Sequence, residues 1–245
     1  MQEGLCPFSL IYNIQHLIHL SNVSYALTFS IVLSRHYVSP EEKQKLSEAL
    51  PSSFDEIITG MMLGDGNIRM NGKHALLSVQ QKDEEFVKHL WDICNKYGIL
   101  INPVKKLIRT DKKYGTIKTS YVFQTFTLPY FTKLYNKWYQ NIGKLTFKVI
   151  PVDIDKTLTP LALSYWVAGS GTFDKSRNRI FLCTDNFTKE ECEQLQVILL
   201  NKFGIETYLK LNGVKSRDQY RIVIPKKELN PFQNLILDYL HPSMY

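Results

Sequence analysis

A single carboxylate closes an apolar, helix-like run in the first third of the chain. In "ITGMMLGDG" (58–66), Asp65 stands between two glycines at the end of that run. A second segment, "LSYWVAGSG" (163–171), has the same shape, but Ser170 occupies the position of the acid. A carboxylate at a helix C-terminus meets the negative end of the helix dipole, which is unfavourable unless a cation shares the site. The intact acid and its replaced counterpart are therefore the first candidates for chemistry.

The same order of elements follows both segments, and this internal repeat organises the chain. The first segment is followed by the strand "HALLSVQQ", the helix "DEEFVKHLWDICNKYGI", a basic strand pair and the helix "PYFTKLYNKWYQ". The second is followed by "RIFLCTD", "TKEECEQLQVILLNKFGI", another strand pair and "PFQNLILDYL". Gly64 and Gly169 are 105 residues apart, and Gly98 and Gly204 are 106 apart. We therefore expect an α+β fold of two pseudo-symmetric αββαββα half-domains.

The repeat divides the chain into an N-terminal extension (1–52, mostly helical), half-domains at 53–150 and 161–245, and a linker at 151–160. Ser39 is expected to cap a short helix before Pro51, and Ser53 the helix that follows. Residues 1–38 are read as an amphipathic or core-packing segment, because "YALTFSIVL" is too short to span a bilayer. An organelle-targeting or leader-like extension is the open alternative.

Small residues predict a close contact between the two glycine-ended helices. Gly60 and Gly64 in the first, and Ala168 and Gly169 in the second, would let the backbones approach. The alternative is that Gly64 is only a helix C-terminal glycine. Matched positions in both repeats favour the helix contact.

The two segments resemble the paired motifs of the LAGLIDADG homing endonucleases, in the single-chain form with two motif copies. The resemblance covers residues 53–245, including the repeat order. It implies a saddle of two four-stranded antiparallel sheets straddling a nucleic-acid duplex, with the motif helices at the centre and carboxylates at two scissile phosphates. Mg²⁺, which prefers one or two carboxylates plus waters and phosphate oxygens, is the implied cofactor. The implied metal positions are Asp65 and the backbone at Gly64 and Gly169.

The resemblance also marks departures at the second half-site. The family places an acid where this chain has Ser170, and the nearest acids, Asp174 and Asp185, lie downstream. Lys148 in "FKVIP" matches the family's first basic catalytic residue, with a solvated surface lysine as the alternative reading. The second lysine would follow the segment 242–245, where the sequence stops. We expect the catalytic set Asp65 and Lys148, with Ser170 as a degenerate position.

Positive charge predicts an anionic partner. The chain has 30 Lys and Arg against 23 Asp and Glu, a formal net charge of +7 and a pI near 9.1. The four cysteines show no zinc-ligand spacing, and we read them as free thiols in a reducing compartment. Basic and amide residues on the repeated strands and hairpins are the candidate nucleic-acid contacts: Arg69, Lys73, Gln80, Lys105, Lys106, Arg109, Lys112, Lys113, Lys118, Lys175, Arg177, Arg179, Lys210, Lys215, Arg217 and Arg221.

Two functions of different classes follow. The first is a nucleic-acid-binding protein with impaired double-strand cleavage, acting as an intron maturase or RNA-folding factor. The second is an active, Mg²⁺-dependent site-specific endonuclease, or a nickase that uses Asp65. The partners expected are double-stranded DNA, structured intron or ribosomal RNA, or both, with no membrane and a monomeric chain. The resemblance implies a mitochondrial or other organellar matrix.

Overall fold

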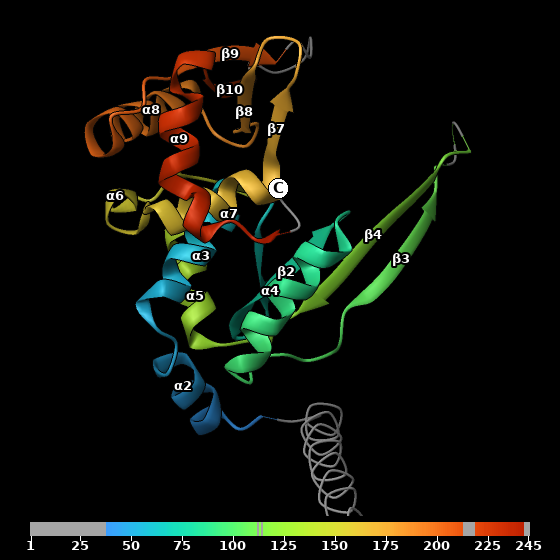
Figure 1. Cartoon of the computed structure of the whole chain (residues 1–245). Coiled ribbons are helices and arrows are strands. Elements are labelled where there is room, and N and C mark those ends of the chain that lie inside the picture. Colours follow the sequence, from blue (N-terminus) through green and yellow to red (C-terminus); the bar gives the residue numbers. More distant parts are fainter. Residues whose placement is uncertain (1–37, 112, 114, 213–218, 243–245) are drawn as a thin grey trace, which may run out of the picture.

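The computed structural model describes residues 38–111, 113, 115–212 and 219–242. Two half-domains of identical element order lie on either side of a central helix pair (Figure 1). The first comprises α3 (Ser52–Leu63), β1 (Asn67–Asn71), β2 (His74–Gln81), α4 (Glu84–Lys96), β3 (Lys105–Thr110), β4 (Ile117–Gln124) and α5 (Pro129–Trp138). The second comprises α7 (Pro160–Ser170), β7 (Gly171–Asp174), β8 (Arg179–Cys183), α8 (Lys189–Phe203), β9 (Tyr208–Asn212), β10 (Gln219–Ile224) and α9 (Leu229–Ile236). The prediction of a doubled αββαββα unit is confirmed.

Each half contributes one four-stranded antiparallel sheet, and the two sheets have the same topology. The strand order is β1-β2-β4-β3 in the first and β7-β8-β10-β9 in the second. Helices α4 and α5 pack on one face of the first sheet, and α8 packs on the second. The long β3–β4 hairpin extends beyond α4 (Figure 1). Each sheet therefore has one face packed on helices and one face that the helices leave open.

Several elements lie outside the repeat. They are α2 (Pro40–Glu48), a hairpin of β5 (Tyr139–Ile142) and β6 (Leu145–Lys148), α6 (Ile154–Thr157), and the short 3₁₀ helices η1 (Lys226–Glu228) and η2 (Leu237–Tyr239). The β5–β6 hairpin was not predicted, and α6 lies within the segment expected to be a linker. Within the described ranges, no helix is long and apolar enough to cross a membrane. The expectations for residues 1–37 lie outside the described residues.

One predicted helix cap is confirmed and the other is wrong. The Ser39 Oγ accepts a hydrogen bond from the Glu42 backbone N–H at 3.1 Å, which caps α2. Ser53 does not cap α3, because that helix already begins at Ser52 after Pro51. The helix there starts without a side-chain cap.

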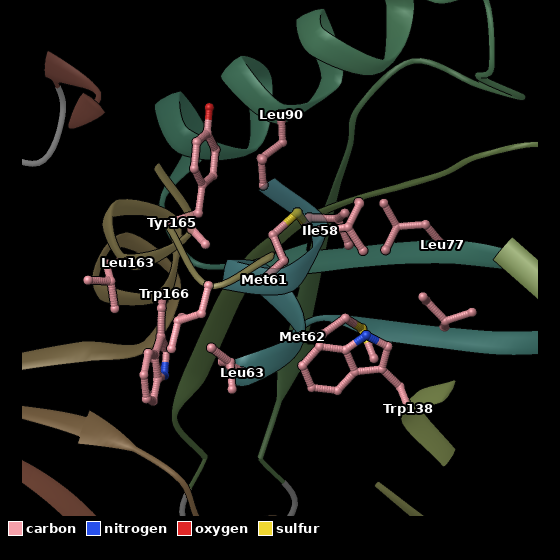
Figure 2. Packing of buried hydrophobic residues seen from close by; sticks show 14 of the residues in the cluster. Ile58, Met61, Met62, Leu63, Leu77, Leu90, Trp138, Leu163, Tyr165 and Trp166 are labelled. Atoms are coloured by element: carbon pink, nitrogen blue, oxygen red, sulfur yellow. The ribbon is translucent and has the colours of Figure 1, made fainter. Parts of the chain in front are cut away.

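The two motif helices form the centre of the core. Ile58, Met62 and Leu63 of α3 and Leu163 and Trp166 of α7 are all buried. Figure 2 shows Trp166 beside Leu63, and Trp138 at the end of α5 beside Met62. A helix that is apolar on nearly every side must be enclosed by other elements. The central place of α3 and α7 follows from that composition.

Close approach of these helices depends on Gly60 and Gly64, as predicted. A Cβ at position 60 would overlap the Ala162 carbonyl oxygen and lie 2.8 Å from the Tyr165 Cβ. A Cβ at position 64 would lie 2.9 Å from the Ser170 Cβ. The prediction for Gly169 is wrong, since a Cβ there would meet only the Gln81 Nε2 at 3.8 Å. At the end of α7 it is Ser170 that packs against Gly64 of α3, whereas Gly169 faces the Gln81 side chain.

Candidate active site and nucleic-acid interface

Asp65 projects from a tight turn at the end of α3. The backbone N–H groups of Gly64 and Gly66 both donate to the Met61 carbonyl oxygen, at 3.1 and 2.7 Å. A Cβ at position 66 would lie 2.6 Å from the Met61 carbonyl carbon, so this turn requires glycine. The side chain of Asp65 is exposed between the two glycines. The turn therefore presents the carboxylate outward at the negative end of the helix dipole.

Lys148 lies against this turn. Its Nζ donates to the carbonyl oxygens of both Gly64 and Gly66, at 2.9 Å each. Burial lowers the pKa of Lys148 to about 7, while the nearby Asp65 carboxylate acts to raise it. The alternative of a solvated surface lysine is wrong.

The β5–β6 hairpin holds Lys148 in place. Tyr139 lies opposite Lys148 in the hairpin register. The Tyr139 hydroxyl donates to the Asn67 Oδ1 and accepts from the Ile68 backbone N–H, each at 3.2 Å. The hairpin is thus attached to β1 on one strand and to the Asp65 turn on the other. Sequence reasoning missed Tyr139, because a four-residue strand with mixed polarity carries almost no periodic signal.

At the second half-site, Ser170 is neutral and faces the first motif. Its Oγ donates to the Trp166 carbonyl oxygen at 3.2 Å, and its Cβ faces Gly64. Both neighbouring acids are already paired. Asp174 accepts from Ser176 and Arg179, and these bonds lower its pKa to about 2. Asp185 is paired with Arg221 at 3.2 Å, so neither acid is an unpaired carboxylate beside Ser170.

Gln81, another residue that sequence reasoning missed, makes a hydrogen bond between the two halves. Its Nε2 donates to the Gly169 carbonyl oxygen at 3.0 Å, linking the end of β2 to the end of α7. Asp65, Gln81 and Gly169 line one cavity of about 10 Å³, room for about one water-sized group. The rest of its lining is largely apolar, with Met61, Val79, Phe86 and Leu90. The Asp65 carboxylate is therefore the charged group that a hard cation would bind there. The carbonyl oxygens of Gly64 and Gly169 each already accept a hydrogen bond, from Lys148 and from Gln81, so Asp65 is the residue best suited to hold a cation.

No group of three or more His, Cys, Asp or Glu side chains that could hold a metal occurs in the part of the chain that the structure describes. A divalent ion beside Asp65 would therefore take most of its ligands from water and from a bound phosphate. Mg²⁺ accepts this arrangement, since it keeps several waters and is commonly bound by one or two carboxylates together with substrate phosphates. The residues present fit Mg²⁺ in the first half-site and fit it poorly in the second.

On the first sheet, strand alternation separates the candidate contacts into two faces. Ala75, Leu77 and Val79 of β2 point into the core, so Gln80 points to the open face. Register places Lys105 opposite Val122, which is also opposite Gln80, and places Arg109 opposite Lys118. The residues of this open face from the candidate set are Arg69, Gln80, Lys105, Arg109 and Lys118. Lys106 lies on the other face, opposite Tyr121.

On the second sheet, the same alternation brings Arg179, Lys210 and Arg221 to the open face. Ile222 and Ile224 belong to the core, so Arg221 points the other way, with Lys210 and Cys183 as its register partners. Arg179 is mostly buried on this face by Asp174 and Tyr208. Exposed turn residues are Lys73, Lys113, Lys175 and Arg177, whereas Lys112, Lys215 and Arg217 lie outside the described residues.

This architecture is shared with a known protein family. The model of the LAGLIDADG DNA endonuclease family matches residues 55–232, which includes both motif helices and both sheets. The chain belongs to the LAGLIDADG DNA endonuclease family. The resemblance drawn from the two motifs is confirmed.

Some relatives of this chain are named as maturases and others as endonucleases. The chain is 32% identical over 195 residues to the Saccharomyces cerevisiae cytochrome b mRNA maturase bI2, covering 77% of this chain and 45% of the yeast protein. It is 29% identical to a probable intron-encoded endonuclease 1 of Wickerhamomyces canadensis, covering 78% and 81% of the two chains. The solved structure of the homing endonuclease I-WcaI bound to its DNA recognition sequence matches with a TM-score of 0.76 and 26% identity, covering 89% of this chain and 95% of that chain.

Proposed function

We propose that this chain recognises a long, specific duplex target through the open faces of its two sheets and does not cut both strands. The observation that carries this proposal is Ser170, which faces Gly64 where a second carboxylate would be needed. Neither nearby acid is available to replace that carboxylate. A neutral hydroxyl loses most of the Coulomb attraction that a carboxylate exerts on a divalent ion. Cleavage of the strand at the second half-site is therefore impaired, so the duplex is not cut through both strands.

DNA is the proposed target of the saddle. I-WcaI, which shares this architecture over most of both chains, was solved bound to its DNA recognition sequence. Basic residues on the open faces would hold phosphates, while Gln80 and arginines would contact base edges. Because one chain supplies both motif helices, we propose that it acts as a monomer.

An intron-maturase role is the second part of the proposal. Two relatives at 32% and 31% identity are named cytochrome b mRNA maturases. A protein that keeps the saddle but lacks the second carboxylate retains a large basic surface suited to folding structured intron RNA. The names of these relatives also support an organellar setting.

Single-strand nicking is the alternative activity, and the first half-site favours it. Asp65 would hold a divalent ion, which when bound lowers the pKa of a coordinated water and screens a phosphate. Asp65 would orient that water. Lys148 lies beside the carboxylate with a pKa near 7, so it can hold or release a proton close to the reacting phosphate at neutral pH.

Selection from random sequence tests the proposal. The full chain is used to select binders from random duplex DNA and from a library of structured RNA, and the selected molecules are then incubated with Mg²⁺ or Mn²⁺. We expect the selected duplexes to share a consensus sequence and to show no cut through both strands after the incubation. A clean double-strand break would overturn the claim of impaired cleavage, and the absence of any duplex consensus would overturn the claim of DNA recognition.

A further inference from the structure

Two arginines on the open face of the second sheet form the same kind of ion pair but are left in different states. The Arg179 Nε donates to the Asp174 Oδ2 at 3.0 Å. The Arg221 Nε and Nη2 donate to the two carboxylate oxygens of Asp185, at 3.3 and 3.2 Å. What remains of each guanidinium after pairing decides what it can bind.

The guanidinium of Arg179 is bonded and largely buried within the protein. Its Nη1 donates to the Tyr208 hydroxyl at 2.9 Å, and its Cζ lies 4.6 Å from the centre of the Phe181 ring. Only 11% of its side chain is exposed. Arg179 therefore joins β7, β8 and β9, and its burial leaves little of the guanidinium accessible to a ligand.

Arg221 keeps a free edge. Asp185 occupies the Nε–Nη2 side, and among the described residues the Nη1 has no hydrogen-bond partner. The side chain is 31% exposed, and the outer edge still carries N–H groups on both Nη1 and Nη2. The guanidinium is thus fixed in orientation with one pair of donors unused.

Asp185 lies in the turn after β8 and is itself held by residues of β9 and β10. The Asn212 Nδ2 donates to its Oδ1 at 3.2 Å, and the Gln219 Nε2 donates to its backbone oxygen at 3.1 Å. A carboxylate fixed in this way restricts the arginine that it binds. Restricting a long side chain before binding lowers the entropy lost on contact.

We propose that Arg221 reads a guanine in the second half-site, with Asp185 as its positioning residue; this inference rests on the proposed recognition of duplex DNA. Two parallel N–H donors match the O6 and N7 acceptors that guanine alone presents together in the major groove. Lys210, its cross-strand neighbour, would contact a phosphate, which positions the duplex without reading sequence. The structure thus separates one base-reading arginine from one structural arginine on the same sheet.

Base preference, measured position by position, tests this inference. The full chain and the variants Arg221→Ala, Asp185→Asn and Asp174→Asn are each used to select binders from random duplex DNA, after thermal unfolding has confirmed that each is folded. Affinities are then measured for duplexes carrying each of the four bases at every consensus position. Arg221→Ala is expected to lose a guanine preference of roughly 10-fold or more at one position, the size of a good bidentate contact. Asp185→Asn is expected to weaken the same preference, and Asp174→Asn to leave every preference unchanged.

The possible outcomes separate the inference from the function on which it rests. If the wild-type chain yields no duplex consensus, DNA recognition itself fails. If it yields a consensus that Arg221→Ala leaves unchanged at every position, base reading by Arg221 is wrong. If Arg221→Ala removes the guanine preference but Asp185→Asn does not, Arg221 reads the base without help from Asp185 and the positioning role is wrong. A uniform loss of affinity for all four bases would make Arg221 a phosphate contact instead.

Discussion

Lys148 donates to the two carbonyl oxygens that flank Asp65, with its Nζ 2.9 Å from both Gly64 and Gly66. These residues are separated by 84 and 82 positions in the chain. One contact therefore fixes the shape of the acidic turn and keeps a basic group beside it. This contact holds the turn of the first half-site in place. In the described part of the second half, no comparable contact surrounds Ser170.

Replacing Lys148 tests this arrangement through the pH dependence of the unfolding free energy. The folded pKa of Lys148, about 7, lies below the ordinary 10.5. Between these values the unfolded chain binds a proton that the folded chain has lost, so the unfolding free energy rises with pH. We expect wild type to gain stability over Lys148→Met by up to about 4 kcal/mol between pH 7 and pH 10. Urea titrations of both proteins across this range measure the difference, and parallel curves would show that Lys148 stays charged.

Asp65→Asn tests the first half-site. If the chain nicks its selected duplex, the variant should lose that activity by at least about 100-fold, as for loss of a group that positions and activates water. Binding should change only slightly, because Asp65 is exposed and the turn is built from glycines. Relaxation of a supercoiled plasmid carrying the selected site measures nicking. Equal nicking by variant and wild type would move the chemistry away from Asp65.

Ser170→Asp restores the charge at the second half-site. The substitution should convert nicked plasmid to linear product in the presence of Mg²⁺, since a carboxylate there can again share a divalent ion. Ser170→Asn, of matching size but neutral, is the control and should leave the product unchanged. Linear product from the asparagine variant would show that charge is not what position 170 lacks.

Adjacent lysines on opposite faces of β3 test the interface. Lys105→Ala should reduce the slope of log affinity against log salt concentration by about 1, as expected for one lost phosphate contact. Lys106→Ala should leave the slope unchanged, because Lys106 lies on the face opposite the proposed interface. Fluorescence anisotropy with a labelled selected duplex at several salt concentrations provides both slopes. Equal effects would place the nucleic acid elsewhere on the hairpin.

Gly60→Ala tests the helix contact. The added methyl would overlap the Ala162 carbonyl oxygen, and we expect a loss of about 1–3 kcal/mol in unfolding free energy. Gly169→Ala is the matched control on the other motif helix. It meets only a side-chain nitrogen at 3.8 Å and should be neutral, or stabilising by up to about 1 kcal/mol. Chemical denaturation distinguishes the two.

The sequence was informative wherever a pattern was long or doubled. Both motif helices, both sheets and the close approach at Gly60 could be predicted, since the repeat supplied each element twice. The β5–β6 hairpin could not, because its strands are four residues long and its anchor, Tyr139, acts through a single hydroxyl. Gln81 and the Asp174–Arg179 pair were missed for a related reason. Gln81 bonds to the Gly169 carbonyl oxygen at the end of a helix 88 residues away, and the Asp174–Arg179 pair depends on where the β7–β8 turn falls. Neither contact follows a periodic pattern in the sequence.

The packing of the two halves depends on Gly60 more than on Ser170. Gly60 is enclosed by Ala162 and Tyr165, so a change there disturbs the join between the two halves. Ser170 sits at the last position of α7, half-buried, with one hydrogen bond to its own helix. The charge at position 170 can therefore change by substitution while the join between the two halves stays intact.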